Sequence, residues 1–136
     1  MAAKIFIIED EPIAVKNIGN ILKCEGYEIA GTAAGLQKAS EMINSMDVDL
    51  VICNLYLKFT FSGEKIIKLI KSVKEIPFVF LSSFTHDERL NKILRTKSEI
   101  YLCSPYTSEQ LLHSVKKLLN NFSKKQNHSF YSLTVL

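Results

Sequence analysis

The sequence predicts an α/β domain made of five strand–helix units, with a parallel sheet that helices cover on both faces. Short apolar runs alternate along the chain with segments whose apolar residues recur at helical spacing. The apolar runs are continuous rather than alternating, which is typical of parallel strands buried on both sides. The 136 residues, of which 47% are hydrophobic, suffice for one such domain with an ordinary core. We expect right-handed crossovers between the strands.

The predicted strands are short and rich in β-branched and aromatic residues, which favour extended structure. The second has the weakest signal, and the fourth begins with a proline, which the first residue of a strand tolerates. In chain order they are Lys4–Ile8, Tyr27–Ala33, Leu50–Cys53, Pro77–Leu81 and Ile100–Cys103.

The predicted helices follow these strands. Pro12 suits the first turn of a helix and Gly26 suits its end, so the first helix lies between them. Glu11 is expected to cap this helix, where negative charge is favourable. The later helices are predicted around Leu36–Met46, Glu64–Val73, Leu90–Leu94 and Gln110–Phe122.

The C-terminal segment is predicted to be separate from the domain, which gives a domain at 1–122 and a tail at 123–136. The final residues SFYSLTVL partly alternate between polar and apolar, with Phe130, Leu133 and Val135 among the apolar positions. The tail could be an added strand, a docking segment, a partly ordered terminus or a point of truncation.

Composition excludes several classes of protein. The net charge of +3, from 17 basic and 14 acidic residues, is too small to predict binding to nucleic acid or a membrane. Three cysteines without a CxxC pair argue against a disulfide framework or a zinc site. No signal peptide is visible and no apolar run is long enough to span a membrane, so we expect a reduced, cytoplasmic protein.

Polar residues stand where the predicted strands end. In open parallel sheets, binding sites lie at the carboxyl ends of the strands, so these positions are the candidates for a site. They are Glu9, Asp10 and Glu11 after the first strand, Asn54 after the third, Ser82 and Ser83 after the fourth, and Ser104 after the fifth.

Four segments at these positions carry a family resemblance. They read IFIIEDEP, DLVICNLYLKFTFSGEKII, IPFVFLSSF and IYLCSPY, in that order along the chain. From about Lys4 to Phe122 the sequence resembles the receiver (CheY-like) domain of bacterial two-component response regulators. The resemblance implies a doubly wound, flavodoxin-like fold with strand order 2-1-3-4-5. It also implies transfer of a phosphoryl group from a histidine kinase to an aspartate, assisted by Mg²⁺.

The resemblance assigns roles to several residues. Glu9 and Asp10 match the acids that hold the cation, as clustered carboxylates suit a hard divalent ion. Asn54 matches the phosphoacceptor aspartate. Ser82 matches the hydroxyl residue that binds the phosphoryl group, and Tyr101 matches the aromatic residue that reports the change.

Two of the matched positions depart from the family. An uncharged carboxamide at Asn54 is a poor nucleophile and cannot form the usual acyl phosphate, although its oxygen remains a weak ligand for a cation. Ser104 stands where the family has a lysine that pairs with the phosphoryl group. Losing one negative and one positive group leaves the local formal charge unchanged, which favours a natural degenerate site over a single engineered change. We hypothesise that Asn54 is a hydrogen-bonding plug or a weak Mg²⁺ ligand beside Glu9 and Asp10.

The expected function is that of a pseudo-receiver, a signalling module that acts through protein contacts and is not an enzyme. The expected partner is a sensor histidine kinase or an output protein, and the face made by helix four, strand five and helix five could also form a homodimer. A first alternative keeps Mg²⁺ and phosphorylation at Ser82, Ser83 or Ser104. A second, of a different class, is a flavodoxin-like cofactor binder or enzyme. The carboxylates in EDEPIA would repel a phosphate group and argue against it.

Overall fold

Parallel strands form the centre of the protein. The computed structural model describes residues 2–59, 63–73, 75–83 and 99–135. Within these ranges the sheet has five parallel strands in the order β2-β1-β3-β4-β5. This order confirms the predicted doubly wound fold. The strands are β1 (Lys4–Ile8), β2 (Glu28–Ala33), β3 (Leu50–Asn54), β4 (Phe78–Ser82) and β5 (Glu99–Cys103).

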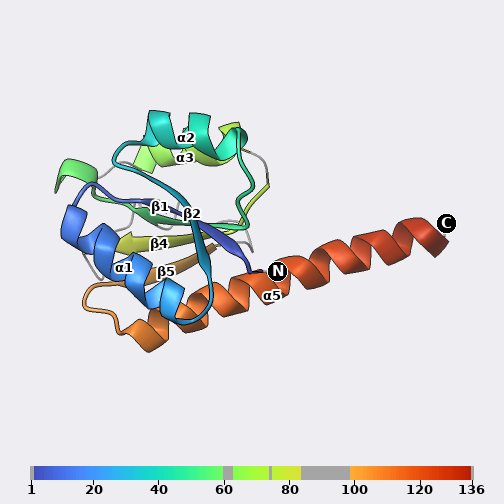
Figure 1. Ribbon diagram of the computed structural model, residues 1–136. Helices are drawn as coiled ribbons and strands as arrows, with labels where there is room; N and C mark the ends of the chain where they lie inside the picture. The colour runs from blue at the N-terminus through green and yellow to red at the C-terminus, as the bar shows by residue number, and fades with distance from the viewer. Residues whose placement is uncertain (1, 60–62, 74, 84–98, 136) are drawn as a thin grey trace.

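Helices cover both faces of the sheet (Figure 1). Helices α1 (Pro12–Cys24) and α5 (Ser108–Val135) lie on one side, and α2 (Leu36–Asn44) and α3 (Gly63–Ser72) lie on the other. A short 3-10 helix, η1 (Leu57–Phe59), follows β3. The helix predicted around Leu90–Leu94 lies outside the described residues.

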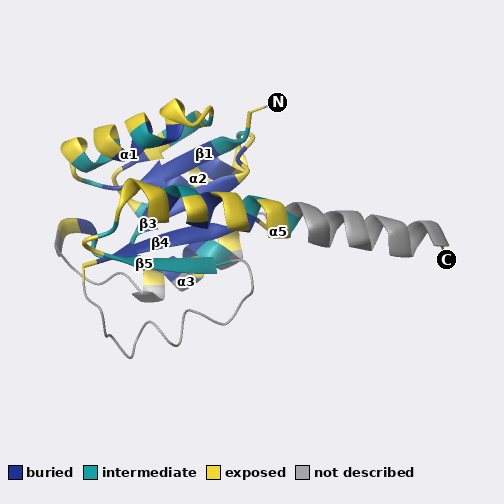
Figure 2. Ribbon diagram, turned by 90° about the horizontal axis from the view of Figure 1, so that it is seen from below, coloured by how far each residue is buried: buried dark blue, intermediate teal, exposed yellow. Residues whose placement is uncertain are grey.

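The core consists of two layers separated by the sheet. On β1, Phe6 and Ile8 belong to the layer under α2 and α3, whereas Ile5 and Ile7 belong to the layer under α1 and α5. Successive side chains of a strand point to opposite faces, so a strand buried on both faces must be apolar throughout. Figure 2 shows the central strands buried and β5, at the edge of the sheet, only half-buried.

Local signals explain where α1 and α5 begin and where α1 ends. Pro12 is the first residue of α1, and Gly26, just beyond its end, has a φ of 91°, which a glycine adopts without strain. Glu11 is the N-cap residue, as predicted, although its side chain makes no capping hydrogen bond and contributes its negative charge alone. Helix α5 starts two residues earlier than predicted because Thr107 and Gln110 form a capping box. The Gln110 N–H donates to Thr107 Oγ1 at 3.1 Å, and the Thr107 N–H donates to Gln110 Oε1 at 2.8 Å.

Helix α5 runs on to Val135, past the predicted end at Phe122 and across the expected start of the tail. The suggestion of an added strand is therefore wrong. No glycine or proline occurs between Ser108 and Val135, so nothing in the sequence forces the helix to stop. The last turns of α5 extend beyond the sheet (Figure 1). None of the helices in the described part of the chain is both long and apolar enough to cross a membrane.

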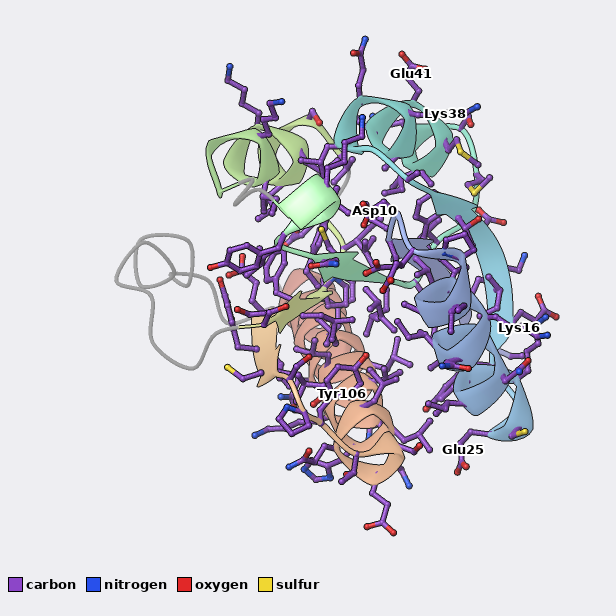
Figure 3. The ribbon with its side chains drawn as sticks, turned by 90° about the vertical axis from the view of Figure 1, so that its left-hand side faces the viewer. Asp10, Lys16, Glu25, Lys38, Glu41 and Tyr106 are labelled. Carbon is purple, nitrogen blue, oxygen red and sulfur yellow. The ribbon has the colours of Figure 1, made fainter. Side chains whose placement is uncertain are left out.

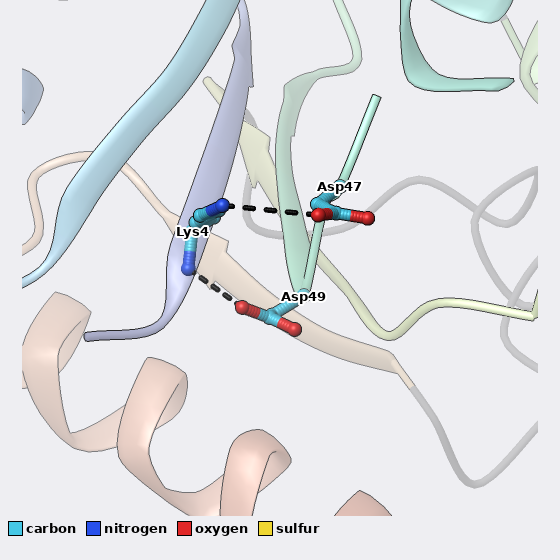
Figure 4. Close-up of polar contacts among 3 residues, drawn as sticks. All are labelled: Lys4, Asp47 and Asp49. Carbon is cyan, nitrogen blue, oxygen red and sulfur yellow. Dashed lines mark hydrogen bonds and ion pairs between the residues drawn. The ribbon is translucent and has the colours of Figure 1, made fainter. Parts of the chain in front are cut away.

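The amino ends of β1 and β3 are joined by polar contacts at the edge opposite the candidate site (Figure 4). The Lys4 N–H donates to Asp49 Oδ2 at 2.7 Å, and Lys4 Nζ lies 3.8 Å from Asp47 Oδ2. The ion pair is exposed, so it adds little to stability. The Asp49 N–H also donates to Lys4 O at 2.8 Å, and this backbone contact continues the pairing of β1 with β3 one residue before β3 begins.

Candidate functional site

The polar residues predicted from the strand ends meet at the carboxyl edge of the sheet. Glu9 and Asp10 follow β1, Asn54 is the last residue of β3 and Ser82 is the last residue of β4. Ser104 follows β5. Figure 3 looks onto this edge, with Asp10 near the middle of the view. Parallel pairing brings these positions together because β1, β3, β4 and β5 all end on the same side.

The carboxamide of Asn54 is held by hydrogen bonds on both of its polar atoms. Its Nδ2 donates to Glu9 Oε2 at 2.7 Å, and its Oδ1 accepts the Tyr56 N–H at 2.8 Å. A backbone N–H can only donate, so the Tyr56 contact requires the oxygen on that side and directs the NH₂ group toward Glu9. Both polar atoms of the carboxamide are therefore bonded within the protein.

Glu9 is a buried carboxyl group, only 7% exposed. Its Oε1 accepts the Glu11 N–H at 3.1 Å. Burial is the main cause that raises the pKa of Glu9 above its ordinary value, and the negative charge of Asp10 adds to the effect. The hydrogen bonds from Glu11 and Asn54 act in the opposite direction, because they stabilise the ionised form.

Asp10 connects the end of β1 to the loop after β3. Its Oδ2 accepts the Lys58 N–H at 2.8 Å. Lys58 lies in η1 with φ 54° and ψ 38°, a left-handed conformation that costs an L-residue about 1 to 2 kcal/mol. The hydrogen bond to Asp10 holds the loop in this strained turn.

The first residue of the loop after β3 remains attached to the sheet. The Leu55 N–H donates to Leu81 O at 2.9 Å, which continues the β3–β4 ladder beyond Asn54. Leu55 and Leu57 are both buried, so the loop contributes to the core on the α2 and α3 side. The position of Asn54 is therefore set by packing as well as by its own hydrogen bonds.

The remaining predicted residues lie toward β4 and β5. Ser82 is 2% exposed, whereas Ser104 is exposed and follows β5 in a cis peptide with Pro105. The Ser104 N–H donates to Ser82 O at 2.7 Å. Tyr101 is half-buried, with its ring centroid 5.6 Å from that of Phe80.

Comparison with known proteins decides the family. The model of the response regulator receiver domain matches residues 5–116. The chain belongs to the response regulator receiver family. It is 28% identical to the response regulator SaeR of Staphylococcus epidermidis over 126 residues, which cover 92% of this chain and 53% of that protein. SaeR of Staphylococcus aureus is 26% identical over 139 residues, which cover 97% of this chain and 59% of that protein. The chain thus spans just over half the length of these curated relatives.

Solved receiver structures share the fold. A CheY-like receiver domain protein from Methanospirillum hungatei JF-1 superposes with a TM-score of 0.80 at 20% identity, covering 92% of this chain and 99% of that one. The response regulator PhyR from Brucella abortus gives a TM-score of 0.81 at 20% identity, covering 97% of this chain and 54% of that one. These two structures show the shared fold, whereas the family match and the SaeR relatives place this receiver within two-component signalling.

Receiver domains generally bind Mg²⁺ at this edge, but the side chains here do not fit the ion as they are arranged. The NH₂ group of Asn54 donates to Glu9 Oε2, so this carboxylate oxygen is already occupied by a hydrogen-bond donor and not free to bind a cation. Among the residues that the structure describes, no group of three or more His, Cys, Asp or Glu side chains is placed to hold a metal ion. The available oxygen ligands are two carboxylates and one amide, and the amide oxygen already accepts the Tyr56 N–H.

Backbone N–H groups are the part of the site that sequence reasoning missed. The N–H groups of Tyr56, Lys58 and Glu11 each bond a side chain of the predicted set. Backbone donors occur at every non-proline residue, so no sequence signal marks those that reach a site.

We expect the pKa of Glu9 to lie above its ordinary value of 4.5 and to rise further in Asn54→Ala, which removes a hydrogen bond that lowers it. Folded Glu9 then binds its proton more readily than unfolded Glu9, so its contribution to stability increases as the pH falls from its raised pKa toward 4.5. An NMR titration of the side-chain carboxyl carbon measures both values. A wild-type pKa below 4.5, or one that Asn54→Ala leaves unchanged, would contradict the prediction.

Proposed function

We propose that this receiver is not phosphorylated at the family's usual position and that it acts through contacts with other proteins. The observation that supports this proposal is the carboxamide of Asn54 at the phosphoacceptor position, bonded to Glu9 on one side and Tyr56 on the other. Acyl phosphate formation needs a carboxylate oxygen as the nucleophile, and an uncharged amide does not provide one.

Ser104 supports the same proposal. The family lysine at this position supplies a positive charge for the phosphoryl group, and a serine hydroxyl carries none. Asn54 and Ser104 together leave the formal charge of the site as it would be with an aspartate and a lysine. Neither side chain carries a charge that the other must balance, so charge balance at the site does not depend on the phosphorylation chemistry.

The contact surface in this proposal includes β5 and the exposed side of α5. β5 is half-buried at the edge of the sheet, and Tyr106, between β5 and α5, is also half-buried. The partner is a sensor histidine kinase, an output protein or a second copy of the chain. A switch requires a ligand that binds two states with different affinity, and without phosphorylation a protein partner supplies that difference. The module is cytoplasmic and non-enzymatic, and with a net charge of +3 it binds neither nucleic acid nor a membrane.

Beryllofluoride, which mimics the phosphoryl group, tests the proposal in an NMR titration of backbone amides with Mg²⁺ present. The wild type is expected to show no saturable shift at Ser82 or Tyr101. Asn54→Asp/Ser104→Lys restores the carboxylate and the cation, so it is expected to show one.

The control for this titration is Ser104→Lys alone, which keeps the amide and should remain unresponsive. A saturable shift at Ser82 and Tyr101 in the wild type would overturn the proposal and favour phosphoryl-type switching that includes Ser82, Ser83 or Ser104.

A further inference from the structure

The end of β1 and the loop after β3 are connected by hydrogen bonds that require no metal ion. We infer that Asn54 replaces the family's divalent cation in its structural role. Its hydrogen bonds hold the end of β1 and the loop after β3 together permanently and independently of Mg²⁺. The Asn54 lock denotes the side chains of Glu9, Asp10 and Asn54 with the backbone N–H groups of Tyr56 and Lys58.

The lock joins the two segments at separate points. Asn54 bridges Glu9 and the Tyr56 N–H through contacts of 2.7 and 2.8 Å. Four residues later the Lys58 N–H reaches Asp10 at 2.8 Å. A cation in this position would also hold the β1 carboxylates against the β3 loop, and here the chain does so with its own donors.

The lock also supplies hydrogen-bond donors to the carboxylates whose negative charge a cation would otherwise neutralise. Glu9 is buried beside Asp10, and unpaired buried carboxylates are costly. Glu9 receives N–H donors from Glu11 and Asn54, and Asp10 receives one from Lys58. Hydrogen bonds from N–H groups to carboxylates are among the stronger ones in proteins, so these acids are satisfied without an ion.

An aspartate at position 54 would reverse this arrangement. It would place a carboxylate oxygen against Glu9 Oε2 in place of the NH₂ donor. The Tyr56 contact could remain, but Glu9 would face a second negative charge in addition to Asp10. Three clustered carboxylates favour a divalent cation, so the single change should convert a hydrogen-bonded closure into a cation-dependent one.

Thermal unfolding in EDTA and in excess MgCl₂ tests the inference on the wild type, Asn54→Asp and Asn44→Asp. The wild type is expected to have the same Tm in both buffers. Asn54→Asp should unfold at a lower temperature in EDTA and recover by about 3 to 10 °C once Mg²⁺ reaches ten times its dissociation constant.

Asn44→Asp is the matched control, because it makes the same chemical change elsewhere. Asn44 Nδ2 donates to Ser72 O at 3.0 Å, between the end of α2 and the end of α3. Loss of that contact should lower the Tm equally in both buffers. A Mg²⁺ response in this variant would show that added negative charge alone, and not the lock, explains the result for Asn54→Asp.

Amide hydrogen exchange provides a second measurement that does not depend on the folding of Asn54→Asp. In the wild type the Tyr56 and Lys58 amides should be equally protected in EDTA and in MgCl₂. Asn54→Ala should accelerate exchange at Tyr56, which loses its acceptor. Protection of Tyr56 that appears only with Mg²⁺, or a wild-type Tm that rises with Mg²⁺ as much as that of Asn54→Asp, would overturn the inference.

These outcomes are separate from those that test the proposed function. The lock concerns the response to Mg²⁺ alone, whereas the proposed function concerns the response to beryllofluoride. A wild type that binds Mg²⁺ but ignores beryllofluoride would refute the lock and leave the proposed function standing.

Discussion

Phe80→Ala is expected to lower the free energy of unfolding by about 3 to 5 kcal/mol. Phe80 is fully buried on β4, which pairs with β3 on one side and β5 on the other. Its ring lies 5.4 Å from that of Phe78 and 5.6 Å from that of Tyr101. Removing the ring leaves a cavity in the core layer under α2 and α3 and takes away the ring contact of Tyr101. Urea unfolding followed by circular dichroism measures the change.

Phe80→Leu is the control for this prediction. Leucine keeps most of the apolar volume but loses the ring contacts, so it should cost less than half as much as the alanine variant. If both variants lost the same free energy, ring packing rather than cavity formation would determine stability at this position. If Phe80→Ala cost less than about 1 kcal/mol, the layer between β4 and α3 would have to collapse into the space.

Lys58 should respond in opposite directions to two substitutions. Lys58→Gly is expected to stabilise the protein by up to about 1 kcal/mol, because glycine adopts the left-handed conformation without the cost that lysine bears. Lys58→Pro should destabilise it by about 3 kcal/mol, because proline cannot adopt a positive φ and has no N–H for Asp10. Urea unfolding of both variants measures the two effects.

Lys68→Gly is the matched control for the glycine substitution. Lys68 is an exposed residue of α3, where glycine should cost about 1 kcal/mol instead of stabilising. Equal effects of glycine at positions 58 and 68 would contradict the strained turn at Lys58. A Lys58→Pro variant as stable as the wild type would mean that the Asp10 contact does not hold the loop.

The sheet was predictable because its central strands, β1, β3 and β4, are buried on both faces. Runs such as Ile5–Ile8 contain no polar residue. Such a run is typical of a strand that lies between two layers of helices. The strand ends were less predictable, since hydropathy stops before hydrogen bonding does. Asn54 and Ser82 are polar, yet their backbones still pair, with Leu81 and Cys103 respectively.

The two ends of α5 differ in how far the sequence predicts them. Its start was predicted two residues late, although the spacing of Thr107 and Gln110 is that of a capping box. Its end was not signalled at all. The polar stretch from Lys124 to Asn127 resembles a tail, but it contains no residue that breaks a helix, and α5 continues through it.

The members of the candidate site were predictable from the strand ends, but the contacts between them were not. Parallel strands must bring Glu9 and Asn54 to the same edge, so their proximity follows from the topology. The direction of the Asn54 amide depends on the Tyr56 N–H, which leaves no trace in the sequence. The left-handed turn at Lys58 is equally hidden, because the residue there is not a glycine.

The backbone hydrogen bond of Leu55 has a consequence for the chemical ageing of the protein. Asparagine converts slowly to aspartate when the nitrogen of the following residue attacks the side-chain carbonyl carbon. That nitrogen belongs to Leu55, and its N–H is occupied by Leu81 O at 2.9 Å within the extended ladder. The conversion would create the very carboxylate that the family uses as its acceptor. By holding this nitrogen in the sheet, the fold slows the conversion of the Asn54 amide to a carboxylate.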